Sequence, residues 1–172
     1  MRITRVALLT ILLLAGLVSA EAQVGIFADR LLDPKEYYCP VCKKLVRPGH
    51  IGLEAEVAMI EGTREALFRA GFEYVLSRDE ATKIGLFVFR FEERRGSAWS
   101  VERPASAGFH AHLFRRGNMI KVFEFNETQQ PLSDNVLKLG TFLNRGARWI
   151  TASELAREGI DKAIELFQED LR

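Results

Sequence analysis

The sequence predicts an α/β (α+β) domain, a two-layer sandwich of a mixed, largely antiparallel sheet of four to five strands covered by about three helices. Three observations support this class. Apolar residues recur at the helical period over residues 54–70, alternate at the period of a strand over 84–94 and 105–115, and return to the helical period in the C-terminal part. Helices that cover a sheet bury the apolar faces of both elements, so these segments make one core.

The first 22 residues have the features of a secretory signal peptide. Arg2 and Arg5 precede an apolar run over residues 6–18, and small residues follow at the spacing that signal peptidase requires. The run is shorter than the roughly 20 apolar residues that span a bilayer, so an uncleaved anchor is the less favoured alternative. We therefore expect a signal peptide over 1–22, a single domain over 23–172, a periplasmic or secreted location, and no transmembrane span after cleavage.

The charge of the chain argues against nucleic acid as a partner. The formal net charge is +1, and cleavage after residue 20 would remove Arg2 and Arg5 and change it to −1. Proteins that bind phosphate backbones need a net basic surface or patch, which a nearly neutral chain with short basic pairs at 94–95 and 115–116 does not provide.

The N-terminal half predicts a strand, a loop, a helix and a second strand. The strand covers 24–32 and ends at the following Asp-Pro pair, because proline lacks a backbone donor. A loop runs to about residue 52, and a helix follows over 54–70. Gly71 stands where a left-handed helix cap is expected, before a strand over 72–76. The apolar stripe expected on the helix, with one polar gap, consists of Val57, Ile60, Arg64, Leu67 and Phe68.

The C-terminal half predicts a meander of strands and then helices. The segment 84–94 is apolar on both faces, which is typical of a central strand covered on both sides. Strands at 105–115 and 119–125 follow, joined by a short turn. A helix is expected from about 131 to 146, and Thr151 with Glu154 forms a capping box that starts a last helix.

Cys39 and Cys42 are the reactive pair of the sequence, and they are its only cysteines. In an oxidising compartment, two nearby cysteines favour a local structural disulfide. A thiol/disulfide oxidoreductase is a weaker alternative, because such enzymes place this spacing at the start of a helix and residues 43–49 do not read as one.

The same cysteines match half of a zinc site. His50 follows in the same loop, and His110 and His112 are two residues apart on a predicted strand, so their rings point to one side. If the loop folds over that face, two cysteines and two histidines can form a closed tetrahedral site. Histidines on the solvent side of a sheet are the alternative, and the favoured interpretation needs no cofactor, with zinc as the second.

No signature of a hydrolase, nucleotide-binding or metalloprotease site occurs in the sequence. We therefore predict a non-catalytic interaction module of the cell envelope. Loops carry function more often than packed elements, which selects two segments, 95–106 and 127–133, as candidate partner surfaces. The residues chosen for testing are Trp99, Arg103, Glu127, Gln129 and Gln130.

The chain resembles a family of uncharacterised exported proteins and lipoproteins of Gram-negative bacteria. The residues that carry the resemblance lie at 39–49, 67–71, 95–106, 127–133 and 149–156. In layout such proteins are similar to the amino-terminal domain of TolB and to the curli-secretion lipoprotein family, which implies a small α/β module that binds envelope partners. The resemblance leaves the partner unknown and a homo-oligomer open, and this chain lacks the lipid-anchoring cysteine of many relatives.

Overall fold

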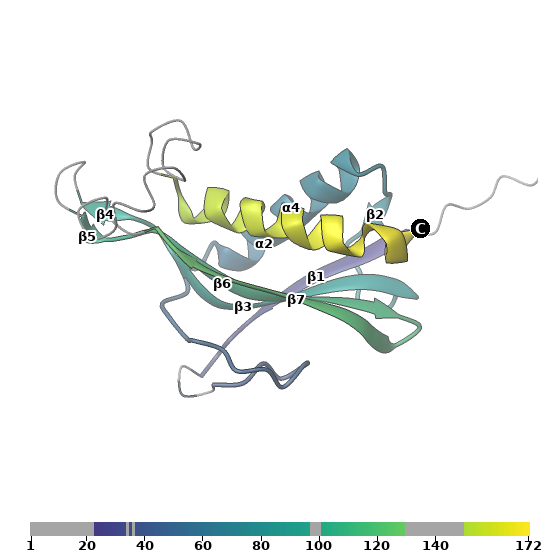
Figure 1. Cartoon of the computed structure of the whole chain (residues 1–172), viewed down its shortest axis with the longest axis horizontal. Coiled ribbons are helices and arrows are strands. Elements are labelled where there is room, and N and C mark those ends of the chain that lie inside the picture. Colours follow the sequence, from purple (N-terminus) through teal and green to yellow (C-terminus); the bar gives the residue numbers. More distant parts are fainter. Residues whose placement is uncertain (1–22, 34, 36, 97–100, 130–149) are drawn as a thin grey trace, which may run out of the picture.

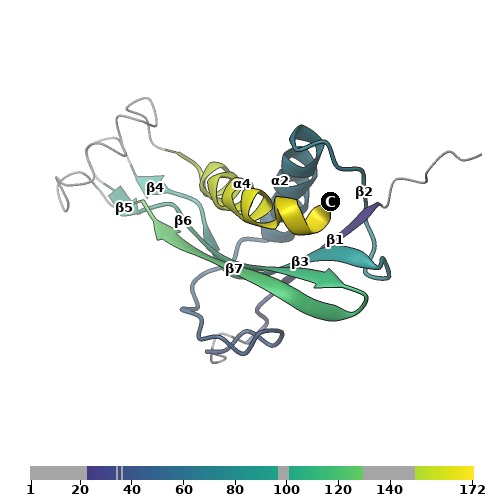
Figure 2. The same cartoon turned by 45° about the vertical axis from the view of Figure 1, so that its right-hand side comes forward.

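The computed structural model describes residues 23–33, 35, 37–96, 101–129 and 150–172. Two helices lie side by side on one face of a five-stranded sheet, and the loop after the first strand lies beneath the other face (Figures 1 and 2). In chain order the elements are β1 Val24–Arg30, α2 Ala55–Arg69, β2 Tyr74–Val75, β3 Thr82–Glu92, β4 Arg95–Gly96, β5 Val101–Arg103, β6 Ser106–Arg115, β7 Asn118–Thr128 and α4 Ala152–Leu171.

The sheet is mixed, as predicted. Its strand order is β2-β1-β3-β6-β7. β1 pairs in parallel with β2 and β3, while the long strands β3, β6 and β7 pair antiparallel. The helix expected at 131–146 lies outside the described residues, and the described part of the chain carries two helices where about three were expected. A short ribbon of β4 and β5 replaces the polar turn expected after β3.

The main core lies between the sheet and the helices. β3 contributes Ile84, Leu86 and Val88 to it, and β6 contributes Phe109, Ala111 and Leu113. The apolar side predicted for the last helix is confirmed, with Leu155, Ile160, Ile164 and Phe167 all buried. The capping box is confirmed too, since Thr151 Oγ1 accepts from the Glu154 amide and the glutamate accepts from the Thr151 amide.

The buried face of α2 agrees with the predicted one only in part, since Leu67 is buried and Ile60 packs against the core but two other members of the stripe are exposed. Val57 is 64% exposed and Phe68 is 77% exposed. The helix instead buries a face rich in small residues: Ala55, Met59, Gly62, Thr63, Ala66 and Leu67. Small residues on this face let α2 lie close to α4 as well as to the sheet, and Gly62 faces Ile160 of α4. The predicted cap at Gly71 is confirmed, with φ +81°.

The other face of the sheet is covered by the loop between β1 and α2. Leu31, Cys39 and Val46 from this loop pack against Phe87 and Phe89 of β3 and form a second, smaller core. β3 is therefore covered on both sides, as its sequence predicts. Among the described residues, none of the helices combines the length and apolar character that crossing a bilayer requires.

Candidate metal centre

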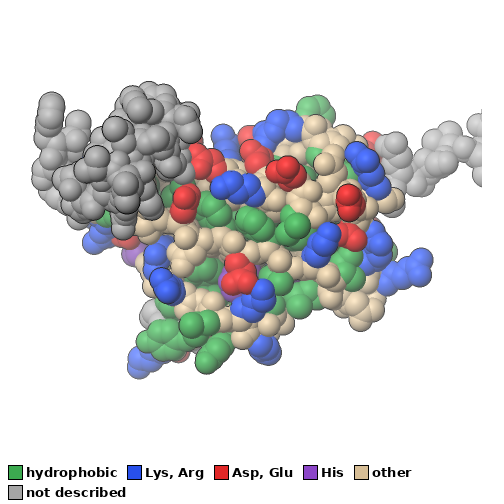
Figure 3. Space-filling view, in the orientation of Figure 1, with side chains coloured by type: hydrophobic (Ala, Val, Ile, Leu, Met, Phe, Trp, Pro, Cys, Tyr) green, Lys and Arg blue, Asp and Glu red, His purple; other side chains and the backbone are tan. Residues whose placement is uncertain are grey.

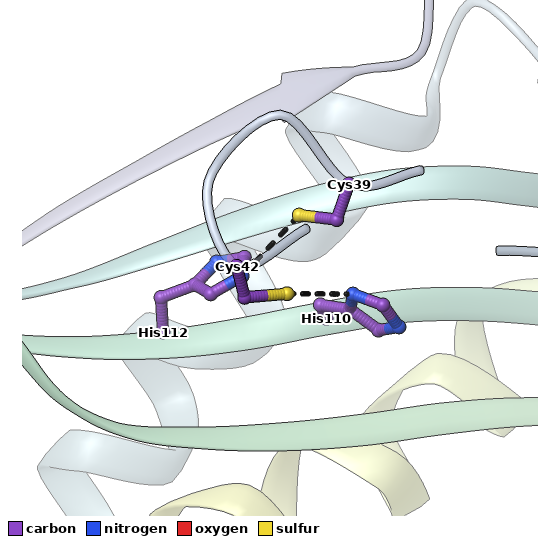
Figure 4. A group of neighbouring side chains, drawn as sticks. All are labelled: Cys39, Cys42, His110 and His112. Atoms are coloured by element: carbon purple, nitrogen blue, oxygen red, sulfur yellow. Dashed lines mark hydrogen bonds between the residues drawn. The ribbon is translucent and has the colours of Figure 1, made fainter. Parts of the chain in front are cut away.

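The two cysteines lie in a tight hairpin formed by residues 37–46, called here the cysteine hairpin. Tyr38 and Leu45 form an antiparallel bridge at its base. At its tip the Lys43 amide donates to the Cys39 carbonyl at 2.9 Å, and the Cys39 amide donates to the Lys44 carbonyl at 2.8 Å. Lys43 closes the turn in the left-handed region, with φ 61°. This short turn directs both sulfurs towards the sheet (Figure 4).

The two histidines come from β6, on the face that the cysteine hairpin covers. Side chains two residues apart on a strand share a face, so His110 and His112 point the same way. Both are buried, with 2% and 1% of their surface exposed. The alternative that they face solvent is therefore wrong, because the loop after β1 folds over them.

The four side chains bring their ligand atoms together. Cys39 Sγ lies 3.4 Å from His112 Nε2, and Cys42 Sγ lies 3.4 Å from His110 Nδ1. All four ligand atoms lie within 4.8 Å of one another. Bond lengths of about 2.3 Å for Zn–S and 2.0 Å for Zn–N put sulfur and nitrogen about 3.5 Å apart in a tetrahedron. The sulfur–nitrogen distances of the Cys39–His112 and Cys42–His110 pairs are therefore already close to those of a tetrahedral zinc site.

Each histidine has a second partner that orients its ring. His112 Nδ1 donates to the carbonyl of Gly85 at 3.2 Å, which leaves Nε2 free to accept or to coordinate. His110 Nε2 lies 3.7 Å from Glu124 Oε2. Glu124 also pairs with Lys44 of the cysteine hairpin. Such outer partners fix the tautomer and raise the basicity of a metal-binding imidazole.

Burial sets the protonation states of the cluster before any metal binds. It lowers the pKa of His112 to about 4, against the raising effect of the Gly85 carbonyl, and it lowers the pKa of His110. Burial also raises the pKa of the Cys39 thiol to about 11, against backbone hydrogen bonds from Cys42 and Val41. The imidazoles are therefore neutral and ready to coordinate, whereas the Cys39 thiol must release its proton to a metal.

The expected disulfide is not present, since Cys39 and Cys42 are both free. Each sulfur contacts a histidine ring nitrogen instead of the other sulfur. The prediction rested on the short spacing of the two cysteines and the oxidising compartment, and the arrangement observed is the alternative in which the loop folds over His110 and His112. The motif also lies in a hairpin and not at a helix start, which agrees with the low weight given to an oxidoreductase.

His50 does not belong to the cluster. It lies in an exposed stretch beside the end of β3, where its carbonyl accepts from the Phe91 amide. Its side chain lines an open cavity of about 270 Å³ together with Glu54, Glu92 and Arg103. Four of the five candidate metal ligands therefore lie together, and His50 lies elsewhere.

Three of the five candidate partner residues lie in the described part of the chain. Arg103 pairs with Glu92 at 2.5 Å. Gln129 is buried, and its side-chain oxygen accepts from the Ile150 amide. Glu127 is half-buried on β7. Trp99 and Gln130 lie outside the described residues.

Sequence reasoning did not place Glu124 beside a candidate ligand. The register pairs His110 with Glu124 across β6 and β7. An irregularity between Leu113 and Phe114 shifts this register by one residue, so counting back from the tight turn at Arg116 and Gly117 would have placed Phe123 opposite His110. The sequence alone therefore gave no signal for this contact.

Comparison with known proteins shows similarity of fold only. No protein-family model matches the chain, and no curated protein does. A PelC dodecamer from Paraburkholderia phytofirmans has a similar structure, with a TM-score of 0.53, 10% identity, and coverage of 86% of this chain and 87% of that one. The expected similarity to TolB is not shown.

Two further solved structures match the chain with lower TM-scores. One is a protein of Xanthomonas campestris assigned to the DUF330 family, with a TM-score of 0.47, 11% identity, and coverage of 87% of this chain and 89% of that one. The other is a minor lipoprotein from Acinetobacter baumannii, with a TM-score of 0.33, 11% identity, and coverage of 88% and 91%.

Proposed function

We propose that this protein is a non-catalytic module of the bacterial cell envelope whose binding surface is held in place by one zinc ion. The observation that carries the proposal is the set of four ligand atoms, from Cys39, Cys42, His110 and His112, within 4.8 Å of one another. Four protein ligands fill a tetrahedral zinc site and leave no open position for water or substrate. A closed site of this kind supports structure and not catalysis.

Zinc is the metal that the donor set favours. Two thiolates with two imidazoles in a tetrahedral arrangement select zinc over the hard ions magnesium and calcium, which prefer oxygen ligands. The Gly85 carbonyl and the Glu124 carboxylate beside the two rings are the outer partners that zinc-binding histidines usually have.

The ion would join the cysteine hairpin to the sheet. Apart from the cluster, the hairpin is held to the sheet mainly by the packing of Cys39 and Val46 on Phe87 and Phe89 and by the exposed pair of Lys44 and Glu124. Exposed ion pairs contribute little stability, about 0–1 kcal/mol. Metal binding at a site that forms only in the folded state adds its free energy to folding. Zinc would therefore be the strongest interaction that holds the cysteine hairpin in place on the sheet.

The surface that zinc would order is unusually apolar. Tyr37, Tyr38 and Leu45 of the cysteine hairpin are 57%, 61% and 62% exposed. Figure 3 shows apolar side chains gathered at the lower left, where the hairpin lies in Figure 1. Tyrosine is enriched at protein–protein contacts because it offers a large rigid surface with a polar end. We therefore assign partner binding to the cysteine hairpin.

The envelope location rests on the leader. Residues 1–22 would be removed on export, and residues 23–172 would form the mature domain. The similar PelC structure is a dodecamer, which supports a homo-oligomer for this chain as well.

Metal analysis of the purified protein tests the proposal. Native mass spectrometry should show one zinc ion per chain that a chelator removes, and elemental analysis should identify the metal. Cobalt added to the stripped protein should give the visible spectrum of a tetrahedral site with thiolate ligands. A chain that binds neither metal would refute the zinc site, and the denatured mass reports separately whether the leader is cleaved.

Histidine variants supply matched controls. His110→Ala and His112→Ala should each lose most of the metal, while His50→Ala, which removes the histidine outside the cluster, should retain it. Equal retention in all three variants would show that the metal is bound elsewhere.

Site-specific photo-crosslinking tests the partner surface. A crosslinker placed at Tyr38 in the envelope is compared with one placed at the exposed Glu169 on α4.

A further inference from the structure

The outward face of α2 carries an apolar surface that nothing in the described part of the chain covers. Leu53 in the turn before the helix is 85% exposed, Val57 is 64% exposed and Phe68 is 77% exposed. Glu61 and Arg64 lie between them and pair with each other at 2.5 Å. These five residues are called here the α2 outer stripe.

The outer stripe is a continuous line and not a scatter of single residues. With 3.6 residues per turn, positions 53, 57, 61, 64 and 68 fall on one side of a helix. The residues that α2 buries, such as Met59 and Ala66, lie on the opposite side. A helix that is apolar on two opposite sides is typical of a helix covered on both. The sheet and α4 cover one side, which leaves the stripe for another molecule.

The order of residue types along the stripe makes it complementary to itself. An apolar residue stands at each end, and one acid and one base stand between them. If a second copy lies antiparallel across it, Leu53 meets Phe68 of the second copy at both ends. Val57 then lies against the aliphatic part of Arg64, and Glu61 comes within reach of Arg64 of the second copy. A surface that matches itself under a two-fold axis is what an isologous dimer requires.

The charges favour a second copy over another kind of partner. The stripe holds one positive and one negative group and has no net charge, so a strongly acidic or basic surface would gain little from it. We propose that two copies of this chain associate through the α2 outer stripe, with the two α2 helices antiparallel. The contact is independent of the metal cluster, which lies on the opposite face of the sheet.

The contact of one helix with another buries less than the roughly 1,600 Å² of a standard interface. The dimer should therefore be weak, and the fraction of chains in it should rise with protein concentration. Sedimentation equilibrium of the full protein over a range of concentrations should show reversible self-association. Phe68→Ser should weaken it at least tenfold without loss of helix content, because the side chain is exposed. Leu76→Ser is the matched control, since Leu76 is 65% exposed but lies after β2 and outside the stripe.

The charge pair gives a sharper test of the antiparallel register. Glu61→Arg alone places like charges across the two-fold axis, and so does Arg64→Glu alone, so each variant should self-associate at least tenfold more weakly than the wild type. An equimolar mixture of the two variants should form a heterodimer more tightly than either forms a homodimer. A wild-type chain that stays monomeric, a Phe68→Ser variant that associates normally, or a mixture with no preference for the heterodimer would each overturn the proposal.

Discussion

His112 and Gly85 occupy paired positions on β6 and β3, and His112 Nδ1 lies 3.2 Å from the Gly85 carbonyl oxygen. A carbonyl can only accept, so Nδ1 carries the proton and Nε2 faces Cys39 with a free electron pair. One backbone oxygen of the sheet therefore fixes which nitrogen of the ring is available to a metal. The same glycine is constrained on its side-chain face, where a Cβ would lie 2.4 Å from Phe27 Cζ.

Gly85→Ala should destabilise the protein by about 1–3 kcal/mol, the usual cost of overpacking. The added methyl group must displace the Phe27 ring, which stacks on Phe114 and lies under the guanidinium of Arg78. Urea denaturation measures the change. Phe27→Leu makes room for the methyl group, so Gly85→Ala should cost less in that background. Equal costs in both backgrounds would mean that the clash with Phe27 is not the cause.

Glu124→Gln should weaken zinc binding by about 10–100-fold, the usual effect of losing an outer partner of a metal ligand. The change removes the negative charge 3.7 Å from His110 Nε2 and leaves the coordinating atoms in place. Competition with a chelator of known affinity measures it. Because Glu124 is half exposed, the stability of the metal-free protein should change by no more than about 0.5 kcal/mol.

Glu169→Gln is the control for that variant, since it removes an equivalent charge from the exposed side of α4. It should bind zinc as tightly as the wild type. If both variants weaken binding equally, the effect of Glu124 comes from net charge and not from its contact with His110.

Removing the metal should loosen the cysteine hairpin and leave the helical layer intact. Hydrogen exchange at the amides of Cys39, Lys43 and Val46 should quicken tenfold or more after chelation, because few other contacts hold this segment. The amides in the middle of α4 should exchange as before, since this helix packs in the main core. Uniform acceleration throughout the chain would instead mean that the metal supports the whole fold.

The sequence carried more information on the four candidate ligands than on the contacts that bring them together. The spacing of His110 and His112 predicts a shared face, and the spacing of Cys39 and Cys42 predicts half a site. Their meeting depends on Leu31 and Val46 packing against β3, which the sequence shows only as apolar residues in a loop. Long-range packing of this kind has no local periodicity, so the disulfide was the simpler prediction.

The error on α2 has a different cause. Periodicity gives weight to large apolar residues, and these selected Val57 and Phe68 for the core. The true core face contains Ala55, Gly62 and Ala66, because α2 approaches α4 and the sheet closely and large side chains would not fit. The last helix has its large residues on its only buried side, and there the same method predicts the core correctly.

Two helix glycines should respond to alanine in opposite ways. Alanine in a helix interior is favoured over glycine by about 0.5–1 kcal/mol. At Gly159 the new Cβ would lie 2.6 Å from Phe125 Cγ, at the root of a ring that packs beside Phe109 and cannot turn away. Overpacking of about 1–3 kcal/mol should outweigh the gain, so Gly159→Ala should lower the urea midpoint.

At Gly62 the nearest atom is Ile160 Cδ1 at 2.9 Å, the free end of a flexible side chain that can shift. Gly62→Ala should therefore be neutral or slightly stabilising, and it serves as the control for helix propensity. A Gly159→Ala variant as stable as the wild type would show that β7 and α4 can move apart at Phe125. The main core around Phe125 would then be less tightly packed than the low exposed fractions of its side chains indicate.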